Sequence, residues 1–266
     1  MFALDAKTLQ RIAPTVGRVV IVDPNPAPAR LLADLLKGIG ARDVAVETAE
    51  DRALYAVQDM EPGLVLTERT GPQLNGETFV RRLRKSNLAS RAVPVIMVTA
   101  EATASTIKGA RDAGVHEFLR KPFTSNDLFR RVETIALKPR DWIEGMTYIG
   151  PDRRRFNSGD YAGPRKRKQD QEATSPAAIK DQSLKILNAA FTQFDSDPAQ
   201  ALRSAARQAE TLKALGVRTG DADLAVAANR LQTLLAGGPV SRAVLRGPVE
   251  ALLAMAAPAA PVARTG

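Results

Sequence analysis

Short apolar segments alternate with helical patterns between residues 18 and 137, and this alternation constrains the fold more than any other feature of the sequence. The apolar segments lie at residues 18–23, 44–46, 63–68, 93–99 and 116–120. The helical patterns lie around Leu31 to Leu36 and at residues 50–60, 76–85, 103–113 and 125–137. Alternation of this kind predicts parallel strands with helices on both faces. We therefore expect an α/β fold with a doubly wound, five-stranded parallel sheet.

Polar side chains follow four of these segments at their carboxyl ends. They are Asp23, Glu68, Thr99 and Lys121. In a doubly wound sheet, ligands bind at the carboxyl ends of the strands. The sequence therefore predicts that these four side chains line one pocket.

These strand ends give residues 18–138 a resemblance to the receiver domains of response regulators, in their flavodoxin-like, chemotaxis-type form. Besides Asp23, the segments at 93–99 and 116–120 run into Thr-Ala and Lys-Pro at the separations seen in that family. Glu68 stands where the family carries its phosphoaccepting aspartate, and Pro24 stands where it carries the second of two adjacent acids. The resemblance implies an atypical receiver, or pseudo-receiver, whose phosphorylation chemistry is disabled or bypassed and which has no enzyme activity.

The same two positions bear on magnesium. A working receiver holds this ion with two acids beside the phosphoacceptor, because the ion demands an oxygen-rich shell. Here one acid is missing, and only Asn25 offers a neutral oxygen nearby. We expect weak or absent magnesium binding and no resident cofactor. The alternative explanation for the missing acid is simple decay of a site that is no longer used.

The extra methylene of Glu68 carries its carboxylate roughly 1.5 Å farther out, toward the place of a phosphoryl group's oxygens. If the roles implied by the resemblance are kept, Lys121 pairs with Glu68 and the Thr99 hydroxyl bonds to it. Phe118, at the position of the family's switch aromatic, would then turn inward. The pocket would resemble the phosphorylated state without phosphate. The alternatives are a plain salt bridge for Lys121 and ordinary core packing for Phe118.

Residues 139–175 form a predicted connector with a dense basic run. Residues 153–168 hold seven of the 38 basic residues of the chain against one acid, Asp160. Four residues at the start of this basic run have side chains suited to a nucleotide site: Asp152, Arg153, Arg154 and Arg155. Arginine forks contact phosphates and guanine edges, and a carboxylate can accept from a guanine amine. The segment resembles the arginine-rich tails of receiver-like cyclic di-GMP effectors, so cyclic di-GMP binding is one interpretation. Nonspecific attraction to nucleic acids or acidic partners and a basic linker folding back on the receiver are the others.

Residues 176 to about 256 change to alanine- and leucine-rich helical spacing, and a flexible tail is predicted at 257–266. Ser175-Pro176 and Asp197-Pro198 each place a capping side chain before a proline, which predicts two helix starts. Apolar stripes at helical spacing predict a small antiparallel bundle. The bundle distantly resembles a histidine-phosphotransfer domain but contains no histidine, so it cannot relay phosphate in that way and a docking role remains.

The only histidine of the chain, His116, begins the fifth predicted strand. Because the chain has no second histidine and no cysteine to complete a metal or phosphotransfer site, we interpret His116 as a surface or turn residue. Neither a signal peptide nor an apolar run of about 20 residues is present, so we expect a cytoplasmic protein without a membrane segment.

These features predict an N-terminal cap helix at 1–17, a receiver at 18–138, the connector and a helical interaction domain at 176–256. We expect a response regulator that acts in two-component or phosphorelay signalling by contacting a histidine kinase, a phosphotransferase or a downstream effector. The alternative is a cyclic di-GMP effector that uses the receiver as a scaffold. Near-balanced charge and the lack of a basic recognition helix in the helical region argue against specific DNA binding.

Overall fold

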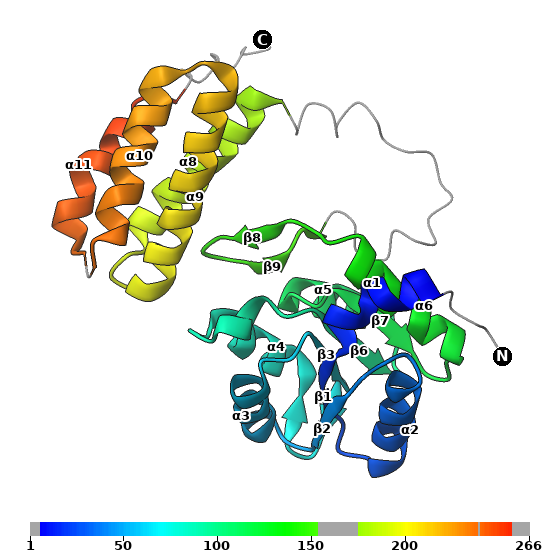
Figure 1. Ribbon diagram of the computed structural model, residues 1–266. Coiled ribbons are helices and arrows are strands. Elements are labelled where there is room, and N and C mark those ends of the chain that lie inside the picture. Colours follow the sequence, from blue (N-terminus) through cyan, green and yellow to red (C-terminus); the bar gives the residue numbers. More distant parts are fainter. Residues whose placement is uncertain (1–5, 154–174, 239, 257–266) are drawn as a thin grey trace, which may run out of the picture. The chain divides into compact units, whose positions relative to one another are not determined.

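The computed structural model describes residues 6–153, 175–238 and 240–256. These residues form two compact units, one of residues 6–143 and 148–153 and one of residues 144–147 and those from 175 onward. The first unit is built on a β-sheet and the second on a helical bundle (Figure 1).

The sheet of the first unit has five parallel strands in the order β2-β1-β3-β6-β7. The strands are β1 (Arg18–Val22), β2 (Asp43–Glu47), β3 (Leu64–Thr67), β6 (Val95–Thr99) and β7 (Glu117–Arg120). The predicted doubly wound α/β fold is thus confirmed. The winding direction reverses between β1 and β3, which places a crevice at the carboxyl ends of these two strands.

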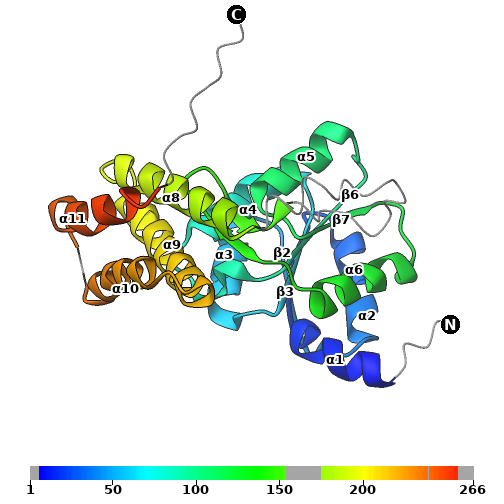
Figure 2. The same ribbon diagram turned by 90° about the horizontal axis from the view of Figure 1, so that it is seen from above.

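Helices cover both faces of the sheet, because successive side chains of a strand point to opposite sides. The helices are α1 (Ala6–Val16), α2 (Pro26–Lys37), α3 (Glu50–Met60), α4 (Gly76–Lys85), α5 (Ala104–Ala113) and α6 (Ser125–Leu137). Val19 and Ile21 of β1 enter the core under α1, α2 and α6, whereas Val20 and Val22 enter the core under α3, α4 and α5. Figure 2 shows α2 and α6 on one side of the sheet and α3 and α4 on the other.

Helix α1 packs on α6 and buries Ile12 and Val16. It ends at Val16, within the cap helix expected at 1–17, and it tolerates Pro14 because a proline in the last turn removes only one backbone hydrogen bond. The end of α1 also lies close to the start of β3. A Cβ atom on Gly63 would lie 2.5 Å from the carbonyl oxygen of Thr15, so only glycine fits this approach.

Part of the predicted connector folds as a two-stranded hairpin, β8 (Trp142–Glu144) and β9 (Ile149–Pro151) (Figure 1). Strand β9 packs against α4, and Ile149 is buried. Gly150 has a φ of 153°, and a Cβ atom on it would lie 2.8 Å from the Cα atom of Gly114. The two backbones meet because neither glycine has a side chain, so β9 is part of the fold of the first unit.

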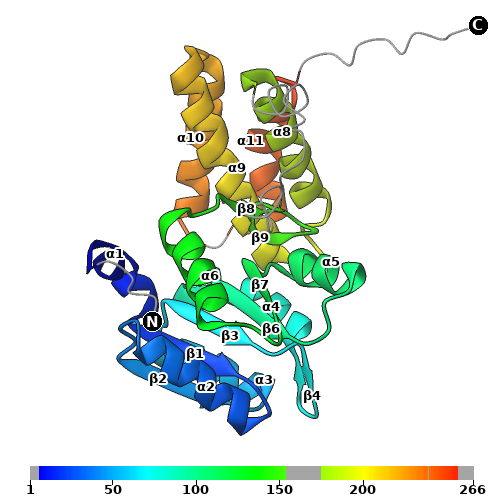
Figure 3. The ribbon, with the colours of Figure 1, turned by 90° about the vertical axis from the view of Figure 1, so that its right-hand side faces the viewer.

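The described part of the second unit contains four long helices, which are α8 (Pro176–Thr192), α9 (Pro198–Thr219), α10 (Ala222–Ala236) and α11 (Arg242–Leu253). Both predicted caps are confirmed, since Ser175 Oγ accepts from Ala178 N at 3.2 Å and Asp197 Oδ1 accepts from Gln200 N at 3.0 Å. Helix α9 packs against α8 and α10, and α11 contacts α10 and α8 (Figure 3). No helix in the described ranges is long and apolar enough to cross a membrane.

A polar stripe on α9 is buried in the second unit. Gln200, Ser204 and Gln208 lie one turn apart and are all buried. Glu144, 2% exposed, accepts a hydrogen bond from Gln200 Nε2 at 3.2 Å, and its backbone carbonyl accepts from Ser204 and Gln208. Arg203 Nε lies 3.7 Å from the same carboxylate and offsets its charge. The spacing of four residues between the polar positions was the available sequence signal, and our sequence interpretation did not use it.

Candidate functional site

Three of the four predicted strand-end residues form one charged cluster. Asp23 follows β1, Glu68 follows β3 and Lys121 follows β7. The Lys121 ammonium lies 2.6 Å from Glu68 Oε2 and 3.1 Å from Asp23 Oδ2. The parallel topology brings the ends of these strands to one edge of the sheet, and the lysine lies between the two carboxylates. We call Asp23, Glu68 and Lys121 the strand-end cluster.

The strand-end cluster is shielded from solvent. The side chains of Asp23 and Glu68 are 3% and 13% exposed, and that of Lys121 is 21% exposed. Burial alone would lower the pKa of Lys121, but the hydrogen bonds and charges of Glu68 and Asp23 outweigh it and raise this pKa above its ordinary value. The amine is therefore protonated at neutral pH and offsets one of the two carboxylate charges.

The second oxygen of each carboxylate is also occupied. Glu68 Oε1 accepts from Arg69 N at 2.7 Å, and Asp23 Oδ1 accepts from Asn25 N at 2.9 Å. The side-chain oxygen of Asn25, which we expected to be available to a metal ion, caps α2 by accepting from Ala27 N at 3.1 Å. The carboxylates are thus held by protein donors on both sides.

These residues do not fit a magnesium site. Magnesium requires near-octahedral oxygen coordination, with carboxylates directed at the ion. An ammonium group lies between the two carboxylates, and Pro24 supplies no third acid. Within the described ranges there is no group of three or more acidic, histidine or cysteine side chains that could hold a metal ion.

Thr99 and Phe118 lie at or near the same edge but do not join the strand-end cluster. The Thr99 hydroxyl oxygen accepts from Glu101 N at 3.4 Å, and in the described structure the hydrogen bonds of the Glu68 carboxylate come from Lys121 and Arg69. The expected hydrogen bond from Thr99 to Glu68 is therefore not formed. Phe118 is 4% exposed and packs in the core under α3, α4 and α5, which both the switch interpretation and ordinary core packing predict.

Arg69 is a member of this neighbourhood that the sequence interpretation missed. Its guanidinium contacts Glu101 closely and lies 3.7 Å from Glu77. A Cβ atom on Gly109 would lie 2.6 Å from the Glu77 carboxylate, so α5 approaches this acid as closely as glycine allows. The sequence signal that indicates this role is a basic residue directly after the strand-end acid Glu68. Arg69 thus links the loop after β3 to the loop after β6.

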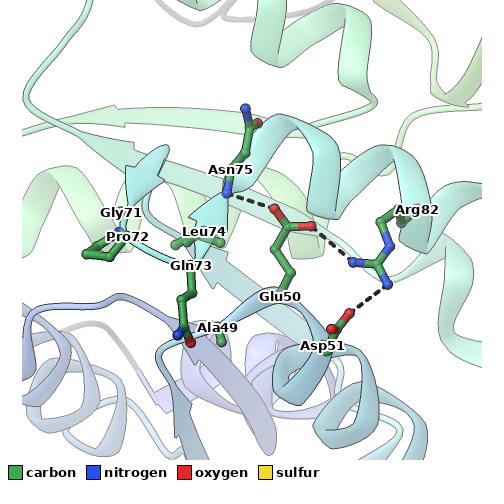
Figure 4. Close-up of a pocket in the computed structure, with 9 residues that line it drawn as sticks. All are labelled: Ala49, Glu50, Asp51, Gly71, Pro72, Gln73, Leu74, Asn75 and Arg82. Atoms are coloured by element: carbon green, nitrogen blue, oxygen red, sulfur yellow. Dashed lines mark hydrogen bonds and ion pairs between the residues drawn. The ribbon is translucent and has the colours of Figure 1, made fainter.

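A polar pocket of about 500 Å³ lies beside this edge, between α3, α4 and a small hairpin of β4 (Thr70–Gly71) and β5 (Leu74–Asn75) (Figure 4). Glu50 accepts from Asn75 N at 2.8 Å and from Arg82 at 3.1 Å. Arg82 also pairs with Asp51 at 2.7 Å. The charged side chains that line the pocket pair with one another, so we assign the pocket a structural role in holding the hairpin of β4 and β5.

A second set of buried charges lies at the opposite, amino ends of β6 and β7. Arg84 is 1% exposed. Its guanidinium donates to the carbonyl oxygen of Gly114 at 3.0 and 3.1 Å and to that of Val93 at 2.9 Å. It also donates to the carbonyl oxygen of Arg91, a residue of the short 3-10 helix η1 (Ala89–Ala92). Its guanidinium lies 5.3 Å from the centre of the Trp142 ring. Burial lowers the pKa of Arg84 to about 9, so the group is charged at neutral pH.

His116 lies in the bend before β7, but its ring is directed inward. Nδ1 accepts from Val95 N at 3.2 Å and lies 3.3 Å from Arg84 Nη2. Burial, and then the charges of Arg84 and Arg140, hold the pKa of His116 well below its usual range. His116 thus occupies a turn position, as one half of our interpretation expected, but the backbone of β6 and the Arg84 side chain supply the partners of its ring.

The arginines proposed for nucleotide binding are only partly described. Arg153 pairs with Asp112 at 3.1 Å, and its guanidinium lies 4.4 Å from the centre of the Tyr148 ring. The backbone N–H of Asp152 donates to the carbonyl of Asp141 at 2.8 Å. Arg154 and Arg155 lie outside the described residues. For Arg153, the contacts fit a linker that folds back on the first unit.

Residues 19–133 match the family model of the response regulator receiver domain. The DNA-binding response regulator MtrA of Mycolicibacterium smegmatis is 32% identical over 133 residues, which are 50% of this chain and 56% of that protein. MtrA of Mycobacterium tuberculosis strain H37Rv is 33% identical over 115 residues, covering 43% of this chain and 48% of that protein. The chain spans about half the length of the curated relatives it matches.

Similar solved structures cover just under half of this chain. The chemotaxis response regulator CheY4 of Vibrio cholerae is 20% identical, with a TM-score of 0.41, over 45% of this chain and 98% of that chain. The receiver domain of sensor histidine kinase PA1611 from Pseudomonas aeruginosa is 25% identical, with a TM-score of 0.41, over 44% of this chain and 94% of that chain.

Proposed function

We propose that this chain, whose residues 19–133 match the response regulator receiver domain of two-component signalling, is an atypical response regulator whose receiver works without aspartate phosphorylation. Its output is contact with signalling proteins, such as a histidine kinase, a phosphotransferase or a downstream effector. The observation that carries the proposal is the Lys121 ammonium held between Glu68 and Asp23.

Two features of the strand-end cluster oppose phosphoryl transfer. Transfer depends on in-line placement of the nucleophile and on a magnesium ion that offsets the phosphoryl charge. Glu68 is longer by one methylene than the family's aspartate, and each of its oxygens already accepts a hydrogen bond, from Lys121 or from Arg69 N. Pro24 removes the second metal-binding acid. The same ion pairs give the pocket a fixed polar arrangement that a partner can recognise without phosphate.

The helical unit fits a docking role in this scheme. The chain has one histidine, His116, and it belongs to the receiver. The bundle therefore has no histidine to carry a phosphoryl group, and its contribution is surface contact with a partner. The two MtrA proteins are named as DNA-binding, but the match covers only about half of each, and the near-balanced charge of the bundle argues against transferring that property to this chain.

Cyclic di-GMP binding by Asp152 and the three arginines after it is the alternative function. The chemistry of the run supports it, but Arg153 would have to leave Asp112 and the Tyr148 ring to contact a nucleotide. Calorimetry with cyclic di-GMP at low salt tests this alternative. Binding that weakens at least about a hundredfold in the double variant Arg153→Ala/Arg154→Ala would support it, and a flat titration of folded protein would remove it.

Incubation with acetyl phosphate and magnesium tests the proposal directly. We expect no phosphate incorporation into the wild-type protein, whereas an aspartate-type control receiver is labelled under the same conditions. Binding to an identified partner should weaken in Glu68→Gln, because the neutral amide breaks the ion pair with Lys121, and should not respond to magnesium. Phosphate that is retained by the wild type and lost in Glu68→Ala would refute the proposal.

A further inference from the structure

A cavity of about 410 Å³ opens at the amino ends of β6 and β7. The strand-end cluster lies at the carboxyl ends of the strands, so the two sites are at opposite edges of the sheet. The cavity is lined by the segment before β6, the start of β7, the end of α6 and the segment that leads into β8. We call it the amino-end cavity.

Positive charge dominates the walls of the amino-end cavity. Arg140 lies within the wall, where it donates to the carbonyl oxygens of His116 and Asp152, and the exposed Lys138 lies beside it in the lining. The one acid in the lining, Glu117, is 4% exposed and pairs with Arg131 at 3.3 Å, which offsets its charge. An anion entering the cavity would therefore meet an excess of positive charge.

The remaining walls are apolar and include one large aromatic ring. Pro94 and Ile135 contribute apolar surface, and Trp142 is partly buried. The Arg84 guanidinium lies 5.3 Å from the centre of the Trp142 ring, within the range of a cation–π interaction. A cavity that combines apolar walls with a few converging polar groups is the usual form of a small-molecule site. Flat rings stack favourably on an indole.

We propose that the amino-end cavity binds a small aromatic anion, with its ring against Trp142 and its carboxylate or phosphate directed to Lys138 and Arg140. Both parts of the ligand are needed, because the cavity offers an aromatic wall and a basic one. This site lies at the opposite edge of the sheet from the strand-end cluster and shares no lining residue with it.

Trp142 is the only tryptophan of the chain, so the tryptophan fluorescence of the protein, excited selectively over its three tyrosines, reports on this cavity. We would titrate the protein with guanosine monophosphate and with benzoate, and use guanosine and inorganic phosphate as probes that lack the charge or the ring. Saturable changes are expected with the two aromatic anions. Guanosine and phosphate should each bind at least about tenfold more weakly, since each loses one set of contacts.

A matched pair of variants locates the binding. Lys138→Gln should weaken binding of both aromatic anions about tenfold, the effect of one lost charge-assisted contact. Lys108→Gln, which removes an exposed lysine of α5 outside the cavity lining, should leave binding unchanged. Both lysines are exposed, so both variants should melt like the wild type. The proposal fails if the aromatic anions give no saturable change, if phosphate or guanosine alone binds equally well, or if the two variants behave alike.

Discussion

The two edges of the receiver sheet hold buried charge in different ways. At the carboxyl ends, Lys121 pairs with Asp23 and Glu68, so opposite side-chain charges offset each other. At the amino ends, Arg84 is surrounded by backbone carbonyl oxygens, which are dipoles without net charge. Both arrangements satisfy the hydrogen bonds of the buried groups. The first arrangement leaves the charge of one carboxylate unpaired by a cation, whereas the second keeps the positive charge of Arg84, so the two edges differ in the sign of their net charge.

This difference determines how the loss of the buried cation at each edge destabilises the fold. Loss of the cation at the carboxyl ends leaves two neighbouring carboxylates that repel each other. Loss of the cation at the amino ends leaves carbonyl oxygens without donors, and no change of pH can protonate an amide carbonyl in the ordinary range. We therefore expect the damage at the amino ends to be larger.

Arg84→Met should have the largest effect on stability. The variant leaves the carbonyls of Gly114, Val93 and Arg91 without their side-chain donor. We expect the free energy of unfolding, measured by urea denaturation, to fall by on the order of 3–5 kcal/mol. Arg81→Met removes a half-exposed arginine from the same helix and should cost under about 1 kcal/mol. Equal losses in the two variants would show that burial of Arg84 contributes little.

Lys121→Met should have the second largest effect, a loss of about 2–3 kcal/mol at neutral pH, because two hydrogen bonds to charged groups disappear. The raised pKa of Lys121 means that its contribution is complete below the ordinary lysine value of 10.5 and is lost as pH rises through the folded-state pKa. The stability difference between wild type and variant should therefore shrink in strong alkali. Lys108→Met is the exposed control, and a difference that stays constant from neutral pH into strong alkali would contradict the ion-pair explanation.

His116→Gln should have the smallest effect, which is confined to acid. The folded protein holds His116 neutral, whereas the unfolded chain takes up a proton below about pH 6.5. The wild type should therefore lose up to about 1.4 kcal/mol of stability per pH unit below that value. The variant should lack this contribution, while its amide oxygen can still accept from Val95 N. Parallel stability curves for wild type and variant between pH 7 and 5 would show that His116 is free to protonate in the folded state.

The strand-end cluster was predictable because its geometry follows from topology. Once five parallel strands are inferred, the residues after their ends must converge, so Asp23, Glu68 and Lys121 could be placed together from the sequence. Helix starts at Ser175 and Asp197 were predictable because a cap depends on neighbouring residues alone. The partner of the Thr99 hydroxyl was not, since it is the backbone N–H of Glu101 in the following loop, which the strand pattern does not indicate.

The amino-end arrangement could not be predicted in the same way. Arg84 lies between Leu83 and Lys85 on a helix rich in basic residues, where a surface position is the ordinary expectation. Its burial depends on carbonyls from η1 and from the turn after α5, which are remote in sequence. Strands β8 and β9 have three residues each, too few to show a periodic pattern, and the surrounding prolines, glycines and charges are typical of a linker.

The contact between Gly114 and Gly150 has a practical consequence for building chimeric proteins. Because each glycine leaves room for the backbone of the other, strand β9 is matched to the turn after α5 and would not fit a receiver that carries a side chain there. A chimera cut at the end of α6 would separate these two partners. An exchange of receivers between proteins of this kind should therefore carry the chain through Asp152, or move both glycines together.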